Sequence, residues 1–118
     1  MVAGSIQTLL QQFVERVNRK AFLRIVTKNW VRNIGVMVQD RNQAFALVFR
    51  GEVAEYTPWQ EHVKYDVVIR GREQDIRLFF QGDELTYLHI RPSIETTGSI
   101  RDQLKMDTLI RLSARQVS

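Results

Sequence analysis

The sequence predicts an α+β fold whose sheet is mainly antiparallel. Hydrophobic residues recur with helical spacing near both ends of the chain, whereas residues 34–70 alternate in the way that strands do. Consecutive strands followed by segregated helices are typical of the α+β class. The chain has 118 residues, of which 44% are hydrophobic, and this suits a single domain over residues 1–118 with one continuous core.

The first element is expected to be a helix over residues 6–17. Its apolar side chains fall at i, i+3, i+4, i+7, i+8 and i+11 and therefore share one face. They are Ile6, Leu9, Leu10, Phe13, Val14 and Val17. Ser5 is a natural N-cap for this helix. Residues 22–30 keep a helical composition, so they either extend this helix or form a second one.

Strands are expected next along the chain. Two of them form a hairpin, because Asp-Arg-Asn at 40–42 reads as a turn. Gly51 and the Thr-Pro pair at 57–58 bound a more polar third strand, and a fourth strand ends at Gly71. The four expected strands are residues 34–38, 44–50, 52–56 and 65–70.

A helix is expected after Gly71, because acidic residues at 73 and 75 complement the dipole of a first turn. Gly82 is its expected C′ residue. Its apolar face carries the adjacent pair Phe79 and Phe80, which a helix points about 100° apart. We therefore expect one ring to pack on the sheet and the other to line a cavity.

The last part of the chain predicts a short helix over 83–89, a short strand over 93–97 and a final helix. Ser99 and Asp102 open this final helix as a capping-box-like pair. The predicted order of elements is therefore α-β-β-β-β-α-α-β-α.

Positive charge is concentrated in the first quarter of the chain. The formal net charge is +4, with +5 in residues 1–32 and −1 in the remainder. In a continuous helix, basic residues four positions apart form one slowly drifting row. We call this row the basic stripe, and it consists of Arg16, Lys20, Arg24 and Lys28. The stripe is either a solvated helix face or a docking surface for an anionic membrane, nucleic acid or acidic protein.

Motifs for catalysis are absent from the sequence. There is no cysteine, no glycine-rich phosphate loop, no nucleophile elbow and no His-Glu-x-x-His zinc motif. His62 and His89 stand far apart in different predicted elements. We therefore expect no enzyme activity, no metal and no cofactor. Nucleic acid is not the favoured partner either, because no recognition motif accompanies the basic residues.

Nothing in the sequence resembles a membrane span or a secretory signal. The longest apolar run covers residues 44–49, whereas a membrane-spanning helix needs about 20 residues. Residues 1–10 contain no charged region that would begin a signal peptide. A cytoplasmic protein is therefore expected.

Apolar residues are crowded into the short elements of the second half. They either fill the core or line a pocket between the helices and the sheet. The candidates for ligand contact are Phe79, Phe80, Leu85, Leu88 and Leu104.

Three segments together resemble the sterol carrier protein type-2 family over nearly the whole chain. They are residues 65–71 (YDVVIRG), 79–82 (FFQG) and 93–98 (SIETTG), followed by a leucine-bearing last helix. The resemblance implies a mainly antiparallel five-stranded sheet covered by helices, with an apolar tunnel between them. It also implies that Asp66 and Gly71 bound a strand, that Gly82 and Gly98 end elements, and that the five apolar candidates line the tunnel.

The chain departs from the family pattern in two places. Pro92 stands where a glycine is often found, and the chain ends without the Ser-Lys-Leu signal of peroxisomal carriers. A small stand-alone member of bacterial type is the better match.

Two functions of different classes follow. The first is non-catalytic binding of an apolar ligand, such as a fatty acyl chain, a sterol-like molecule or another lipid, in a lipid carrier or lipid-binding module. The basic stripe would then approach an anionic membrane. The second is an interaction or accessory module with a filled core that binds a protein or nucleic-acid partner.

Overall fold

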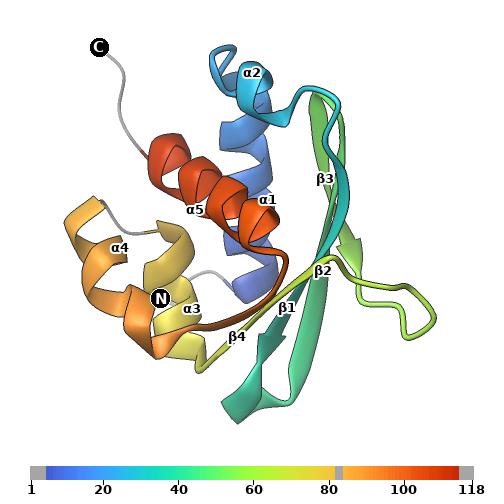
Figure 1. The fold of residues 1–118 in the computed structure, drawn as a ribbon. Coiled ribbons are helices and arrows are strands. Elements are labelled where there is room, and N and C mark those ends of the chain that lie inside the picture. Colours follow the sequence, from blue (N-terminus) through green and yellow to red (C-terminus); the bar gives the residue numbers. More distant parts are fainter. Residues whose placement is uncertain (1–4, 82–83, 115–118) are drawn as a thin grey trace.

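The computed structural model describes residues 5–81 and 84–114. Figure 1 shows the helices gathered on one face of a twisted sheet. The helices are α1 (Ile6–Arg19), α2 (Leu23–Thr27), α3 (Glu73–Gln81), α4 (Glu84–Ile90) and α5 (Ile100–Ala114). The strands are β1 (Val31–Val38), β2 (Gln43–Arg50), β3 (Val53–Pro58), β4 (Val67–Gly71) and β5 (Glu95–Gly98). Short 3₁₀ turns cover Gln39–Arg41 and Arg91–Ser93. The predicted α+β class is confirmed.

The five strands form one sheet in the order β3-β2-β1-β4-β5. Every neighbouring pair is antiparallel except β1 and β4, which run parallel. The predicted five-stranded, mainly antiparallel sheet is therefore confirmed. The hairpin turn also falls where expected, since Asn42 adopts the left-handed conformation with φ of 50° just before β2.

The predicted order of elements lacks one helix. Residues after α1 do not extend it, because Lys20 adopts an extended conformation (φ −89°, ψ 104°) and ends the helix. The chain then turns into the separate five-residue helix α2. As a correction, the order is α-α-β-β-β-β-α-α-β-α, and the basic stripe does not run along one continuous helix.

The helix face of the sheet and the inner faces of the helices form one core. On the sheet side it contains Ile34, Val36, Val38, Leu47, Phe49, Val67 and Ile69. The helices contribute Leu10, Phe13, Ile76, Phe79, Phe80, Met106, Leu109 and Ile110. Side chains alternate between faces along a strand, so the strand residues between these positions face the other side of the sheet.

The other face of the sheet is covered in part by the β3–β4 connection. Trp59 stacks on Tyr65 with ring centroids 4.2 Å apart, and both rings lie over Gly35. A Cβ atom at Gly35 would stand 2.6 Å from the Trp59 ring, so a larger residue would displace it. The Tyr65 hydroxyl accepts a hydrogen bond from the Gln60 backbone N–H over 2.9 Å, which fixes the loop.

The glycine at the end of β5 sits where a side chain cannot fit. Gly98 has φ of 123°, and a Cβ atom there would stand 2.3 Å from the carbonyl oxygen of Asp66. Asp66 precedes β4 and its carboxylate accepts a hydrogen bond from the Asn33 backbone N–H over 2.8 Å. Asp66 and Gly71 therefore bound β4 as the resemblance implied, while the expected stop at Gly82 lies outside the described residues.

Candidate functional site

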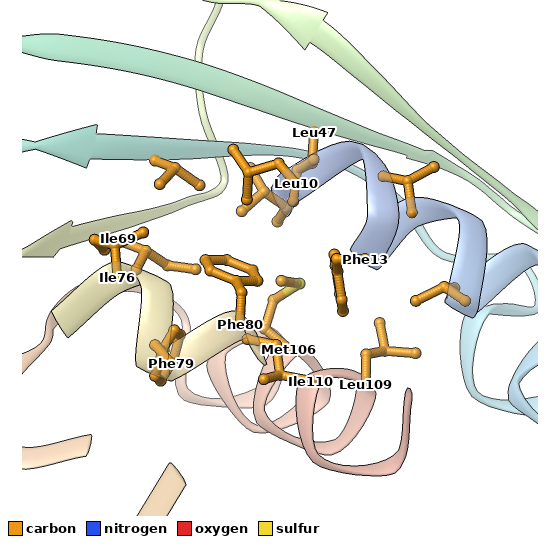
Figure 2. Packing of buried hydrophobic residues seen from close by; sticks show 14 of the residues in the cluster. Leu10, Phe13, Leu47, Ile69, Ile76, Phe79, Phe80, Met106, Leu109 and Ile110 are labelled. Carbon is orange, nitrogen blue, oxygen red and sulfur yellow. The ribbon is translucent and has the colours of Figure 1, made fainter. Parts of the chain in front are cut away.

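Phe79 and Phe80 lie inside the core, with exposed fractions of 1% and 0%. Phe80 meets Phe13 edge-on at 5.2 Å between ring centroids, and Phe79 stacks on Tyr87 at 4.9 Å. In Figure 2 the rings of Phe13 and Phe80 and the side chain of Met106 lie together between α1, α3 and α5. Such close packing leaves no water-sized space beside either ring.

The expectation that one of these rings lines a cavity is therefore wrong for the described residues. Helix α3 does point the two rings in different directions, but α1 and α4 each supply an aromatic partner that fills the space. Contact between Phe79 or Phe80 and a ligand stays a prediction, and it would require these helices to separate.

The three leucines predicted to line the tunnel lie at the surface. Leu85 and Leu88 are 78% and 53% exposed on α4, whose buried residues are Tyr87 and Ile90. Leu104 is 59% exposed on α5. The structure therefore does not bring the five predicted ligand residues together, and Leu104 lines a hollow on the surface.

That hollow is a groove of about 470 Å³ between α2 and α5, which we call the α2–α5 groove. It is lined by Val26, Ile100, Arg101, Leu104, Lys105 and Thr108. The five residues from α5 share one side of the helix, since side chains three and four positions apart are neighbours. Its volume falls in the range of small-molecule sites, about 300–1,000 Å³, and its exposed walls leave it open on one side.

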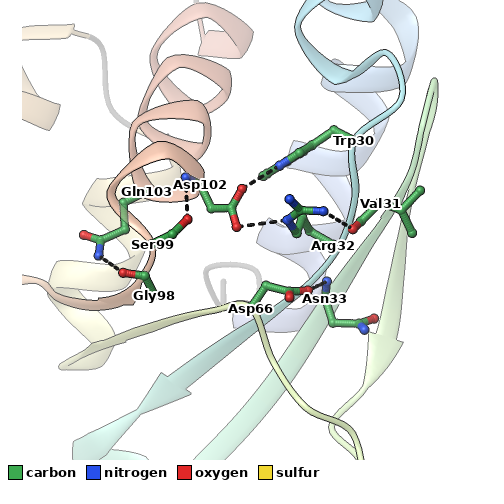
Figure 3. Close-up of polar contacts among 9 residues, drawn as sticks. All are labelled: Trp30, Val31, Arg32, Asn33, Asp66, Gly98, Ser99, Asp102 and Gln103. Carbon is green, nitrogen blue, oxygen red and sulfur yellow. Dashed lines mark hydrogen bonds and ion pairs between the residues drawn. The ribbon is translucent and has the colours of Figure 1, made fainter.

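A hydrogen-bonded cluster fixes α5 against β1 next to this groove. The Asp102 carboxylate, near the start of α5, accepts hydrogen bonds from Trp30 Nε1 and Arg32 Nε, each over 2.9 Å. Figure 3 shows its two oxygens turned toward these two partners. Ser99 caps the helix by accepting the Asp102 backbone N–H over 3.1 Å. The predicted cap at Ser99 is confirmed. The Asp102 carboxylate instead accepts hydrogen bonds from Trp30 and from Arg32 of β1.

The same cluster keeps Asp102 ionised. Burial would raise the pKa of Asp102, but the hydrogen bonds from Trp30, Arg32 and Ser99 and the charge of Arg32 outweigh it and hold the pKa below its ordinary value. Because the Asp102 side chain is only 9% exposed and is paired with Arg32, this arrangement holds α5 in position.

Trp30 joins the groove to the core. Its ring packs on Phe49 at 4.9 Å between centroids, and Lys105 Nζ lies 5.5 Å from the Trp30 ring centroid. This cation–π contact holds the lysine of the groove rim over an aromatic surface.

The basic stripe is divided between two environments. Arg16 turns inward and donates a hydrogen bond to the Phe80 carbonyl oxygen over 2.8 Å. Burial, followed by the charge of Arg19, lowers the pKa of Arg16. Lys20 is half-buried, and burial followed by the charges of Arg16 and Arg19 lowers its pKa. Arg24 on α2 and Lys28 directly after this helix are exposed.

Ile100, Arg101 and Lys105 were missed as site residues by the sequence reasoning. A signal for Ile100 and Arg101 exists, because at 100° per residue they fall with Leu104 on the side of α5 opposite the buried residues, while Lys105 lies at the boundary between the two sides. The buried side carries Asp102, Met106, Leu109, Ile110 and Ser113. Ile100 and Leu104 therefore place two apolar side chains on the solvent side of α5.

Other features of the described residues are less suited to an apolar ligand. A hollow of about 550 Å³ beside Trp59, on the other face of the sheet, has Gln39, Glu61 and Arg70 among its lining residues. No group of three potential ligands for a metal ion occurs in the described part of the chain. None of the described helices combines the length and hydrophobicity that crossing a membrane requires.

No protein-family model and no curated protein matches the chain. Among solved structures, one of a UbiJ-SCP2 ubiquinone synthesis protein is 19% identical over 92% of this chain and 91% of that chain, with a TM-score of 0.65. A crystal structure of sterol carrier protein 2 is 16% identical over 94% of this chain and 96% of that chain (TM-score 0.59).

Two further solved structures extend this likeness. Palmitated SCP2L2 from Aedes aegypti is 11% identical over 91% of this chain and 95% of that chain, with a TM-score of 0.62. The chain also matches 17% of the sec-alkylsulfatase Pisa1 from Pseudomonas sp., at 14% identity over 92% of this chain and a TM-score of 0.68. Together with the sheet order and the helix layer, these matches establish that the chain has the sterol carrier protein type-2 fold.

Proposed function

We propose that this chain is a non-catalytic lipid-binding module that holds the apolar part of an amphipathic lipid in the α2–α5 groove. The proposal is supported by the fold, which the chain shares with a palmitated protein. It is supported more directly by the groove, whose walls are apolar while its rim is cationic.

The lining of the groove carries the proposal. Val26, Ile100 and Leu104 offer an apolar surface, where an acyl chain gains about 25 cal/mol for each Å² of apolar surface removed from water. Arg101 and Lys105 stand at the same groove and offer two positive charges. An apolar wall beside fixed cations matches a long-chain fatty acid, whose hydrocarbon chain ends in a carboxylate.

The openness of the groove sets an expected strength for this binding. Small-molecule sites usually bury 70–90% of the ligand surface, whereas the walls formed by Ile100 and Leu104 are themselves 69% and 59% exposed. Only part of an acyl chain would leave water, and the cost of association reduces the gain further. We therefore expect weak binding that depends on both the chain length and the charge of the ligand.

Titration with a long-chain fluorescent fatty acid, below its micelle concentration, tests the proposal. Val26→Trp should fill the groove and weaken binding about tenfold, a loss of about 1.4 kcal/mol. Leu88→Trp on α4 is the control, because it adds the same ring at an exposed helix position away from the groove. Leu104→Ser is a second groove variant that removes apolar wall at an exposed site without adding bulk.

Wild-type protein that takes up no fatty acid, or a Val26→Trp variant that binds as tightly as wild type, would contradict the proposal. Native mass spectrometry of freshly purified protein adds an independent readout. A copurifying lipid supports lipid binding, and an apo mass that stays unchanged when fatty acids are offered argues against it.

The filled core favours a second candidate. Because Phe79 and Phe80 leave no free space, the chain could act as an interaction or accessory module that binds a protein partner through its surface. The same titration separates the two functions, since an interaction module would take up no fatty acid with either variant or with wild type.

A further inference from the structure

Four of the nine large hydrophobic residues exposed in the described part of the chain lie on or next to α2 and α5. Ile25 on α2 is 81% exposed, and Phe22, which precedes the helix, is also exposed. On α5, Ile100 and Leu104 are exposed and face Val26 of α2 across the groove. Two helices that contact each other therefore both carry exposed apolar side chains.

Four basic residues lie on or beside the two helices. Arg24 is exposed on α2, Lys28 is exposed directly after that helix, and Arg101 and Lys105 lie on α5 at the groove. Helix α2 contains no acidic residue. The acidic residues of α5 turn away from the surface and take part in contacts elsewhere. Asp102 binds Trp30 and Arg32, and Asp107 accepts a hydrogen bond from Tyr87 of α4.

We propose that this surface docks on an anionic lipid bilayer, with α2 and α5 lying against the headgroups. Membrane-surface helices combine basic residues with apolar side chains that enter the boundary between headgroups and acyl chains. The four cations and the exposed Phe22, Ile25, Ile100 and Leu104 have this composition. Nucleic acid is the poorer fit, because the phosphate contacts that dominate its binding make no use of large exposed aliphatic side chains.

Docking in this orientation places the open side of the α2–α5 groove against the bilayer. A ligand in the groove would then be covered by lipid where the protein leaves it uncovered. This use of the groove rests on the proposed function, whereas docking itself depends only on the surface. The docking surface differs from the basic stripe. It includes Arg24 and Lys28 of the stripe together with Arg101 and Lys105, and it does not include Arg16 and Lys20.

The test is cosedimentation with vesicles of phosphatidylglycerol and phosphatidylcholine, beside vesicles of phosphatidylcholine alone. Each basic side chain near an anionic surface strengthens binding about fivefold, so R24Q/K28Q should weaken binding to the anionic vesicles roughly 25-fold. Added salt should weaken wild-type binding, because it screens these charges. The charge-matched control K64Q/R72Q, which removes two exposed cations outside α2 and α5, should bind as wild type does.

A second pair of variants tests the apolar part. Ile25→Ser should weaken binding to anionic vesicles severalfold, while Leu85→Ser, at a similarly exposed position on α4, should leave it unchanged. Equal binding by R24Q/K28Q and K64Q/R72Q would overturn the proposal. Tighter binding of wild type to duplex DNA than to anionic vesicles at the same salt concentration would also overturn it.

The same variants separate this proposal from the proposed function. Arg24, Lys28 and Ile25 do not line the groove, so R24Q/K28Q and Ile25→Ser should take up fatty acid normally in solution without vesicles. Val26→Trp should lose fatty-acid uptake and still dock. Wild type that binds anionic vesicles but takes up no fatty acid would refute the lipid-binding site and support docking, and uptake without vesicle binding would refute docking alone.

Discussion

The two sides of α5 differ, because one side packs into the core and the other presents apolar side chains to solvent. On its inner side, Met106, Leu109 and Ile110 are buried against α1 and α3. On its outer side, Ile100 and Leu104 remain exposed beside α2. The inner apolar residues have been removed from water by protein and stabilise the fold. The outer ones gain nothing comparable until a ligand or a bilayer covers them.

This difference indicates where stability and binding should respond to mutation. Interiors are packed as closely as organic crystals, so deletions there leave cavities that the structure cannot fill. Deletions in an open groove leave no cavity and remove only contact surface for the ligand.

The same deletion on the two sides of α5 should give opposite phenotypes. Leu109→Ala, at a fully buried position, should lower the free energy of unfolding by about 2–5 kcal/mol. Leu104→Ala should change it by less than about 0.5 kcal/mol and weaken fatty-acid binding instead. Urea unfolding and the fluorescent titration measure the two effects. A Leu104→Ala variant as unstable as Leu109→Ala would show that the outer side also belongs to the core.

Asp102→Asn should weaken the attachment of α5 to β1 without changing the apolar residues on either the inner or the outer side of α5. The loss of a charged hydrogen-bond acceptor for Arg32 should lower the free energy of unfolding by about 1.5–3 kcal/mol. The folded-state pKa of Asp102 lies below its ordinary value. Its stabilising effect is therefore complete above the unfolded pKa of about 3.9 and is lost as the pH falls through the folded pKa.

Urea unfolding of wild type and Asp102→Asn tests this dependence at pH values from roughly 3 to 7. This range begins about one pH unit below an ordinary carboxyl pKa and ends about three units above it. The difference between the two proteins should be largest at the neutral end and shrink in acid. A constant difference across this range would mean that the charge of Asp102 does not stabilise the fold.

The smallest effect is expected from Lys105→Gln. Removing the cation over Trp30 should cost about 0.5–1 kcal/mol of stability. It should also reduce the preference of the groove for a fatty acid over the fatty alcohol of equal chain length. Competition between these two ligands measures that preference, with Arg72→Gln as a control outside the groove. An unchanged preference would mean that Lys105 does not contact the carboxylate of the fatty acid, and that either Arg101 or no residue of the groove does.

Local signals predicted much of the fold. The apolar spacing from Ile6 to Val17 and the cap at Ser5 predicted α1, and in the structure Ser5 Oγ accepts the Thr8 backbone N–H over 3.1 Å. Ser99 likewise caps α5. These signals are reliable because capping and face periodicity depend on residues within one or two turns.

Features that depend on distant residues were not predictable in the same way. The end of α1 at Lys20 has no glycine or proline to mark it, and it coincides with Arg16 reaching the Phe80 carbonyl from another helix. The parallel pairing of β1 with β4 is also absent from the strand pattern, because both strands alternate in the same way whichever direction their partner runs.

The candidate site was harder to predict than the fold. In the two-turn helix α4, Leu85 and Leu88 have the spacing of a buried face, but Tyr87 and Ile90 occupy the buried side. A short helix offers too few residues for periodicity to decide between its faces. The groove depends on α2, and the separation of α2 from α1 was one of two alternatives that the sequence left open.

The positions of the two tryptophans give the molecule a built-in optical reporter. Trp30 lies on the helix side of the sheet beneath Lys105, and Trp59 lies on the other side over Gly35. Emission from Trp30 should therefore respond to events at the α2–α5 groove, while Trp59 reports on the opposite face. In a Trp59→Phe variant, the remaining fluorescence would record ligand entry and membrane contact without any attached dye.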